Sequence, residues 1–176
     1  MASVDLRSIQ APLKERYRGD PAAAAVLTGA RSMPYDLSDP QHCTVAPTGF
    51  PEVEIHSGLH PAAGGSGDVP CSGDILAAAL VICEESTIRS VAANMSVELE
   101  SVHVEAKIHW DFRGTMAVDR AVPVGATKVE LRTQIKVKEG VDEERARRML
   151  QSAERYCATL QTLRSGVAVE TDFHLE

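Results

Sequence analysis

Two cysteines lie in the two segments of the chain that have the strongest helical patterns. Cys83 is in the middle of residues 71–95, and Cys157 is near the end of a second amphipathic segment that begins at Asp142. A thiolate is a nucleophile, and two thiols can be oxidised to a disulfide when their Cα atoms come within about 7 Å. A free cysteine is also a common small residue of apolar cores. The spacing alone therefore leaves both a redox pair and a packing role open.

Of the other two cysteines, Cys43 lies in a predicted loop, and Cys71, just before the predicted helical residues, is predicted to be a spectator or loop-packing thiol; neither is expected to pair with Cys83 or Cys157. No C-x-x-C pair occurs, although structural zinc sites normally show such spacing, so no metal site is predicted. The glycines at 64–67 lack the Gly-Lys-Ser/Thr of a phosphate-binding loop. No serine lies in a Gly-x-Ser-x-Gly setting, so the sequence gives little support to a hydrolase.

The central segment, residues 71–95, is predicted to be one long helix. It contains neither Pro nor Gly between Ile75 and Ala93, and Ala and Leu are good helix formers. The expected apolar stripe consists of Leu76, Leu80, Cys83, Thr87 and Val91. Residues 75–82 are apolar all round, which predicts burial on several sides and favours an obligate dimer.

Period-two alternation predicts strands at 102–112 and 128–138, followed by a helix from Asp142 to about residue 165 and a last strand at 167–173. The linker between the first two strands carries Pro123 and Gly125, so antiparallel pairing is expected. Upstream, the pattern predicts a short helix at 13–18, a weak strand at 22–31, a loop at 32–51 and a strand at 52–56. The sequence thus predicts an α+β fold with two helices on a largely antiparallel sheet.

The composition is that of an ordinary globular protein. With 176 residues, a hydrophobic share of 44% and a charged share of 24%, one domain is expected over 1–176, with a variable region at 1–50 and the core at 51–176. A net charge of −7 argues against nucleic-acid binding. The longest apolar run, 75–83, is too short to span a bilayer. No secretory signal is seen, which predicts a cytoplasmic protein with reduced thiols.

Two motifs resemble those of the OsmC/Ohr family, the osmotically inducible and organic hydroperoxide resistance proteins. Residues 72–83, SGDILAAALVIC, are similar to the family's central-helix motif, and residues 154–163, ERYCATLQTL, resemble its second cysteine motif. The resemblance covers about residues 50–174. It implies an OsmC-like fold with two long central helices against antiparallel sheets. It also implies an intertwined homodimer with two active sites at the subunit interface.

The resemblance further implies a thiol-dependent peroxidase that acts on organic hydroperoxides in oxidative-stress defence. Cys83 would attack the peroxide and become a sulfenic acid, and Cys157 would condense with it to a disulfide. An external dithiol, for example of the lipoyl type, or a reducing protein would restore both thiols. No bound cofactor or metal is implied.

The chain departs from the family pattern at the groups that help to organise the thiolate. The organic hydroperoxide resistance branch has a Glu ten residues before the attacking cysteine, where this chain has Gly73 followed by Asp74. The family's activating Arg comes from the N-terminal region, where Arg31 and then Arg18 are the candidates. Mid-helix burial of Cys83 and two following carboxylates disfavour a thiolate, so a nearby Arg is expected to be required.

These departures support an alternative from a different class of protein. The chain would then keep the OsmC-like dimeric fold without efficient peroxide chemistry and act as a hydrophobic-ligand-binding or interaction protein. A further difference is that Ala158 follows the second cysteine, where the family motif often has Pro. The two cysteine motifs favour the enzyme, and the missing Glu favours the alternative.

Overall fold

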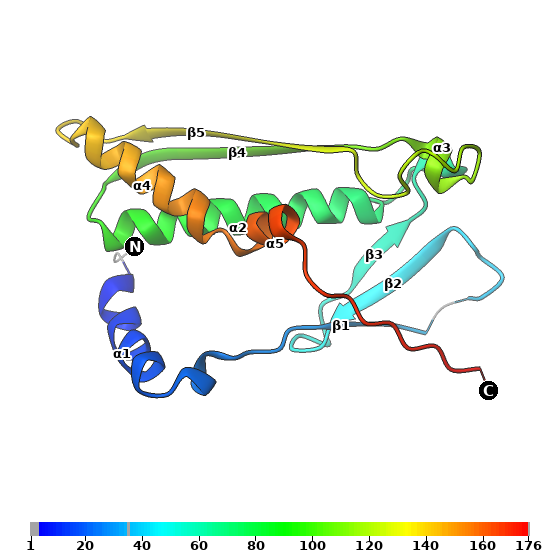
Figure 1. Cartoon of the computed structure of the whole chain (residues 1–176), viewed down its shortest axis with the longest axis horizontal. Helices are drawn as coiled ribbons and strands as arrows, with labels where there is room; N and C mark the ends of the chain where they lie inside the picture. Colours follow the sequence, from blue (N-terminus) through cyan, green and yellow to red (C-terminus); the bar gives the residue numbers. More distant parts are fainter. Residues whose placement is uncertain (1–3, 35, 176) are drawn as a thin grey trace. The chain divides into compact units, whose positions relative to one another are not determined.

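The computed structural model describes residues 4–34 and 36–175. The chain divides into two compact units, one made of residues 1–78 and 105–132 and the other of residues 79–104 and 133–176. The central helix and both strands of the long hairpin pass from one unit into the other (Figure 1). The mixture of helices and antiparallel strands is the predicted α+β class.

The first unit begins with α1, Leu6–Gly19, which is longer than the predicted helix at 13–18. The carboxylate of Asp5 accepts a hydrogen bond from the Ser8 N–H at 3.1 Å and so caps the start of this helix. The predicted strand at 22–31 is wrong over most of its length. Pro21–Ala24 forms a 3₁₀ turn, because proline fixes φ for a helical start, and only Ala30–Ser32 is a strand, β1.

A three-stranded antiparallel sheet follows, with the order β1-β2-β3. Strand β2, His42–Pro47, lies inside the region that was predicted as a loop, and it pairs with β1 at Arg31↔Ala46 and with β3 at Thr44↔His56. The prolines on which the loop prediction was based lie outside this strand or, in the case of Pro47, at its last residue. A proline at these positions costs the sheet no hydrogen bond. Strand β3, Ile55–Gly58, begins three residues later than predicted because residues 51–52 belong to a turn.

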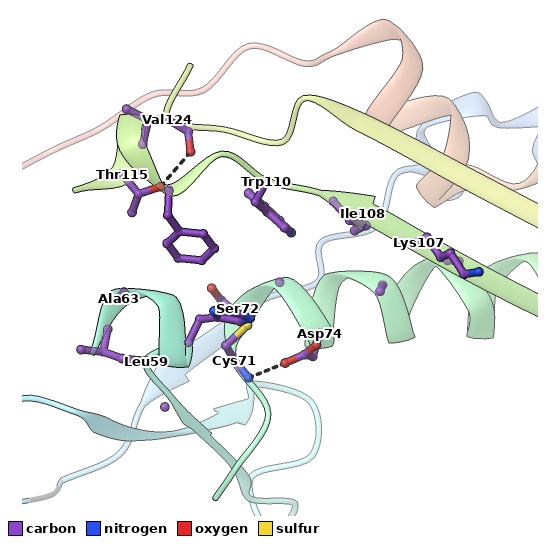
Figure 2. Close-up of a pocket in the computed structure, with 16 residues that line it drawn as sticks. Leu59, Ala63, Cys71, Ser72, Asp74, Lys107, Ile108, Trp110, Thr115 and Val124 are labelled. Carbon is purple, nitrogen blue, oxygen red and sulfur yellow. Dashed lines mark hydrogen bonds between the residues drawn. The ribbon is translucent and has the colours of Figure 1, made fainter. Parts of the chain in front are cut away.

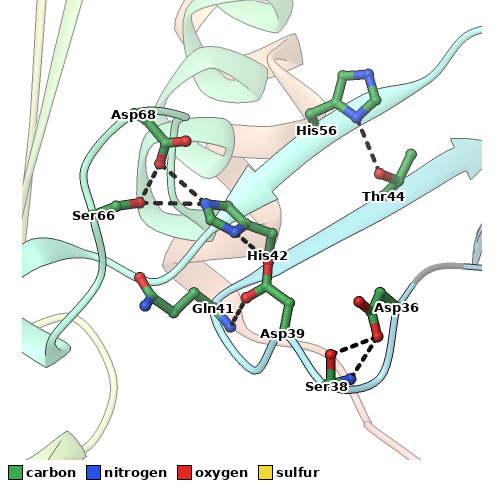
Figure 3. A network of polar contacts seen from close by, with 9 residues as sticks. All are labelled: Asp36, Ser38, Asp39, Gln41, His42, Thr44, His56, Ser66 and Asp68. Atoms are coloured by element: carbon green, nitrogen blue, oxygen red, sulfur yellow. Dashed lines mark hydrogen bonds and ion pairs between the residues drawn. The ribbon is translucent and has the colours of Figure 1, made fainter.

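A polar network ties the start of β2 to the loop that precedes the central helix (Figure 3). His42 Nδ1 lies 2.7 Å from Asp39, while Nε2 lies 3.1 Å from Asp68 and 3.3 Å from the Ser66 hydroxyl. The bonds to Asp68 and then Asp39 raise the pKa of His42, and the bonds from Ser66 and then His42 lower the pKa of Asp68 to about 2. The imidazolium's contribution to stability is therefore present at acid pH and is lost as the pH rises through the raised pKa.

The predicted central helix is present as α2, Ser72–Asn94. Its buried residues in the second unit follow one another at every fourth position: Leu80, Glu84, Ile88 and Ala92. This stripe is rotated by one residue from the predicted one, so that Cys83 and Thr87 lie half-buried at its border. Ile82, expected to be buried, is 68% exposed in the single chain.

The long hairpin consists of β4, Leu99–His109, and β5, Lys128–Val137. Bonds from Thr127 N–H to the His109 carbonyl, 2.8 Å, and from Lys138 N–H to the Glu98 carbonyl, 2.9 Å, close its two ends in antiparallel register. The predicted strand at 102–112 runs too far, because the Asp111 carboxylate caps a short helix, α3, Phe112–Thr115. A Cβ on Gly114 would lie 2.4 Å from the Pro123 carbonyl oxygen, so this turn requires glycine.

The predicted second helix is two helices, α4, Glu143–Tyr156, and α5, Ala158–Ser165, separated at Cys157. Asp142 caps α4 as expected, since its carboxylate accepts the Arg145 N–H at 2.7 Å. The largest fully buried side chains of the described chain are all in the second unit: Leu80, Ile88, Met149 and Cys157.

The predicted last strand at 167–173 is wrong for this chain. Residues 167–175 are exposed and have no assigned helix or strand. Alternation marks a segment that can form a strand, but a strand also needs a neighbour for its backbone hydrogen bonds. Over the described residues, no helix is both long and apolar enough to cross a membrane.

Candidate thiol site

The structure brings Cys83 and Cys157 together within the second unit, although 74 residues separate them in the sequence. Cys83 lies half-buried on α2, and Cys157 lies fully buried at the junction of α4 and α5. Both are free thiols, and each side chain is among the groups that shift the pKa of the other. Cys43, exposed on β2, and Cys71, at the start of α2, belong to the first unit.

The first turn of α5 contacts the sulfur of Cys83. The Thr159 N–H donates to Cys83 Sγ at 3.5 Å, and the Thr159 hydroxyl and the Ala158 N–H are also among the groups that lower the pKa of this thiol. These backbone N–H groups have no partner inside their own helix, and they form the positive end of its dipole. They are available because Cys157 is extended, with φ −70° and ψ 100°, which ends α4 and starts α5.

This arrangement acts on the ionisation of Cys83. Burial would raise the pKa of its thiol, but the hydrogen bonds from Thr159, Cys157 and Ala158 together outweigh burial and hold the pKa below its usual value. The sequence-based expectation named only a nearby Arg as a group that could favour the thiolate. It missed α5 because the break at Cys157 was not predicted.

Cys157 has the opposite character. Burial, together with the adjacent Glu84 and Cys83 side chains, raises the pKa of its thiol to about 12. At neutral pH Cys157 is therefore protonated, whereas Cys83 is the thiol that ionises more readily. The pair is chemically asymmetric in the way that an attacking and a resolving cysteine need to be.

Glu84, directly after Cys83, points into the same buried region. Its side chain is 4% exposed, and its Oε2 atom has no hydrogen-bond partner. The following residue, Glu85, is only half-buried and pairs with Arg89 at 3.4 Å. The sequence analysis did not distinguish these two carboxylates. In the structure Glu84 belongs to the buried stripe of α2 and Glu85 does not.

The two candidate activating arginines lie in the first unit. Arg18 is on α1 and forms an ion pair with Glu15, and Arg31 is exposed on β1. The contacts that lower the pKa of Cys83 come from α4–α5 residues of the second unit. An activating role for Arg31 or Arg18 stays a prediction.

The position of the missing family Glu has a steric explanation. A Cβ on Gly73 would lie 3.3 Å from three atoms of the Trp110 indole, Cε2, Cζ2 and Nε1, so the indole occupies the space of a side chain. The next residue, Asp74, accepts the Cys71 N–H with its carboxylate at 2.9 Å at the start of α2 (Figure 2).

Gly73 and Trp110 border a cavity of about 500 Å³ within the first unit (Figure 2). His60 stacks on Phe112 beside it, with ring centroids 4.8 Å apart. The other apolar lining residues are Leu59, Ala63, Ala77, Ala106, Ile108 and Val124. Cavities of this size and lining bind small apolar molecules in many proteins. Among the described residues, no cluster of three or more His, Cys, Asp or Glu has the geometry of a metal site.

Gly73→Glu is expected to displace the Trp110 indole, because the new Cβ is closer to the ring than side chains normally approach. Trp110 is the only tryptophan of the chain, so its emission reports on this site alone. The measurement is the emission maximum, which should shift to longer wavelength as the ring becomes more exposed. Gly49→Glu is the control, since a Cβ there has no atom within 4 Å. Equal spectra for the two variants would contradict the steric explanation.

Thr159→Val is expected to raise the pKa of Cys83, because it removes the hydroxyl that contacts the sulfur and leaves the backbone N–H in place. One hydrogen bond is worth about 1 kcal/mol, so the alkylation rate of Cys83 at neutral pH should fall about fivefold. The measurement is iodoacetamide alkylation against pH with peptide-level detection. Thr162→Val, on the same helix with its hydroxyl bonded to the Ala158 carbonyl, is the control.

The candidate site is therefore a two-thiol site on an α+β scaffold, in which the sulfur of Cys83 lies at the N-terminus of α5. The sequence profile of the OsmC-like proteins matches residues 65–172, and the chain belongs to that family. The recognition made from the two cysteine motifs is confirmed. A comparison with curated proteins finds no match.

Solved structures share the fold at low sequence identity. An organic hydroperoxide resistance protein OsmC from Legionella pneumophila is 21% identical, with a TM-score of 0.58 over 79% of this chain and 90% of that one. An organic hydroperoxide resistance protein from Elizabethkingia anophelis is 18% identical, with a TM-score of 0.59 over 81% and 91%. An OsmC-like protein of unknown function from Vibrio cholerae is 16% identical, with a TM-score of 0.61 over 78% and 94%. These similarities establish the OsmC-like fold.

Proposed function

We propose that this protein is a cytoplasmic thiol-dependent peroxidase that reduces organic hydroperoxides. The observation that carries the proposal is the contact between a half-buried Cys83, whose pKa is lowered, and a buried Cys157, whose pKa is raised to about 12. Membership of the OsmC-like family, and the similarity to two organic hydroperoxide resistance proteins, support the same reaction.

The proposed reaction has three steps: oxidation of Cys83, formation of the disulfide and its reduction. The Cys83 thiolate attacks one peroxide oxygen, the O–O bond breaks, and the alkoxide leaves as an alcohol after taking a proton, so that Cys83 becomes a sulfenic acid. The sulfur of Cys157 then attacks the sulfur of Cys83, a disulfide forms, and the sulfenic oxygen leaves as water. An external dithiol, for example of the lipoyl type, reduces the disulfide by two exchanges and is itself oxidised to a disulfide.

The proposed active form is a homodimer. Ile82 is 68% exposed on the central helix, and the segment 167–175 leaves Val169 and Phe173 exposed. Large apolar side chains of this kind are typical of surfaces that bind another subunit. Analytical ultracentrifugation tests this part of the proposal, since a folded monomer at micromolar concentration would contradict it.

A second candidate function is the binding of a hydrophobic ligand without efficient peroxide chemistry. The apolar cavity beside Trp110 favours it, as does the indole in the place of the family's Glu. The two candidates differ in an observable way, because only the peroxidase consumes hydroperoxide in proportion to reductant oxidised.

The test is a stopped-flow peroxidase assay with cumene or tert-butyl hydroperoxide, hydrogen peroxide as comparison, and dihydrolipoamide as reductant. We expect turnover with both organic hydroperoxides and a slower reaction with hydrogen peroxide. A wild-type protein that consumes no organic hydroperoxide and yields no sulfenic acid would exclude the peroxidase and leave the ligand-binding function.

A further inference from the structure

Glu84 is a buried carboxylate that the reaction above does not yet use. Among the described residues it is the charged side chain with the least exposure, 4%, and it occupies the stripe of α2 between Leu80 and Ile88. Its Oε2 atom has no hydrogen-bond partner. A carboxylate kept so far from water without full pairing is costly, and such groups are concentrated at functional sites.

The carboxylate is next to the reacting sulfurs. Glu84 follows Cys83 directly in α2, and its side chain, like that of Cys83, is one of the groups that raise the pKa of the Cys157 thiol. The Cys157 thiol is thus the group on which both the Glu84 carboxylate and the Cys83 sulfur act, and all three residues belong to one compact unit. Glu85 points away from this group and pairs with Arg89 instead.

The second step of the proposed reaction has a proton problem at this place. Cys157 must lose its proton in order to attack, yet its side chain is fully buried and has no access to bulk water. The group that leaves Cys83 is formally a hydroxide, which leaves readily only if it gains a proton. The sulfur of Cys157 must therefore lose a proton, and the sulfenic oxygen bonded to the sulfur of Cys83 must gain one.

We propose that Glu84 is the catalytic acid–base residue of disulfide formation, carrying the proton of Cys157 to the leaving oxygen of Cys83 sulfenic acid. The carboxylate accepts the proton from Cys157 Sγ as the S–S bond forms, and it gives a proton to the departing oxygen as the S–O bond breaks. The products are the disulfide and one water, and Glu84 ends as the carboxylate it was. This role rests on the proposed peroxidase function and adds to it the residue that serves the resolving step.

The experiment follows one turnover with a single equivalent of cumene hydroperoxide. Dimedone trapping measures sulfenic acid, and acid quench with mass spectrometry measures the disulfide. Glu84→Gln should form sulfenic acid at the wild-type rate but form the disulfide at least about 100-fold more slowly at neutral pH. Its disulfide rate should rise tenfold per pH unit, as hydroxide replaces the missing base. Glu84→Asp should recover part of the rate, and Glu85→Gln, the matched control, should equal the wild type.

A disulfide rate in Glu84→Gln equal to that of the wild type, with the same dependence on pH, overturns the role of Glu84 and leaves the peroxidase function intact. Absence of sulfenic acid in the wild type overturns the peroxidase function and the role of Glu84 with it. If Glu84→Gln does not fold, the role of Glu84 is tested on the wild-type protein instead. A normal solvent deuterium isotope effect and a disulfide rate independent of pH around neutrality support the proposal, and a rate proportional to hydroxide throughout overturns it.

Discussion

Replacing Cys83 by serine is expected to reduce turnover of organic hydroperoxides to background, a loss on the order of 10⁴-fold or more, as when other enzymes lose their nucleophile. A serine hydroxyl at this site does not ionise at neutral pH, so the Thr159 N–H and the dipole of α5 have no anion to stabilise. The measurement is steady-state consumption of cumene hydroperoxide with dihydrolipoamide.

The matched control is Cys43→Ser, which removes a thiol that is exposed on β2 in the first unit. It should retain full activity. Because Cys83 is half-buried at the border of the core, the serine variant should also keep the wild-type circular dichroism spectrum. Wild-type turnover by Cys83→Ser would exclude Cys83 as the attacking residue.

The parts of the fold that follow from local periodicity were predictable. Helix α2, Ser72–Asn94, lies almost where the uninterrupted Ala-rich and Leu-rich run placed it. The alternation in β4 and β5 likewise defined the hairpin. In such segments the side-chain pattern and hydrogen bonds within the helix, or between two strands that are close in sequence, are sufficient to specify the structure. The two cysteine motifs also sufficed to recognise the family.

The predictions that were wrong concern parts of the fold that depend on contacts between segments distant in the sequence. Strand β2, His42–Pro47, has a buried Ala46 and is defined by its neighbours β1 and β3, which no local pattern reveals. The segment 167–173 has the pattern of a strand without a described neighbour. The break at Cys157 has no Gly or Pro, and the Pro that the family motif often has after this cysteine would have marked the first residue of a new helix.

The chemistry of the site depends on details of the same kind. A rotation of the buried stripe by one residue places Glu84 beside Cys157 and leaves Glu85 with Arg89, although the sequence presents the two carboxylates as equivalent. In the same way, Gly73 marks a missing Glu in the sequence, whereas the structure identifies the Trp110 indole that occupies its space. Neither contact can be derived from spacing, because each joins elements that are distant in the chain.

Replacing Cys157 by serine is expected to stop the reaction after about one equivalent of hydroperoxide per subunit. Cys83 remains able to attack, since the Thr159 hydrogen bonds to its sulfur persist, but no neighbouring thiol is left to displace the sulfenic oxygen. Rapid-mixing measurements should show a burst of peroxide consumption, slower than the wild-type reaction because the Cys157 thiol that helps to lower the pKa of Cys83 is gone, followed by little turnover. Dimedone should label Cys83 in this variant and, with excess peroxide, over-oxidised Cys83 should accumulate.

The variant needs a structural control, because Cys157 is fully buried and a serine hydroxyl there loses its contact with water. Cys157→Ala removes the thiol without adding a buried polar group and should give the same burst and the same stall. Thermal melts of both variants separate lost stability from lost resolution, since the burst amplitude reports only folded protein. Continuous turnover by Cys157→Ala, with dihydrolipoamide as reductant, would show that the reductant attacks Cys83 sulfenic acid directly and that Cys157 does not resolve it. A burst followed by a stall at one equivalent in both variants is the outcome that the asymmetric ionisation of the two thiols predicts.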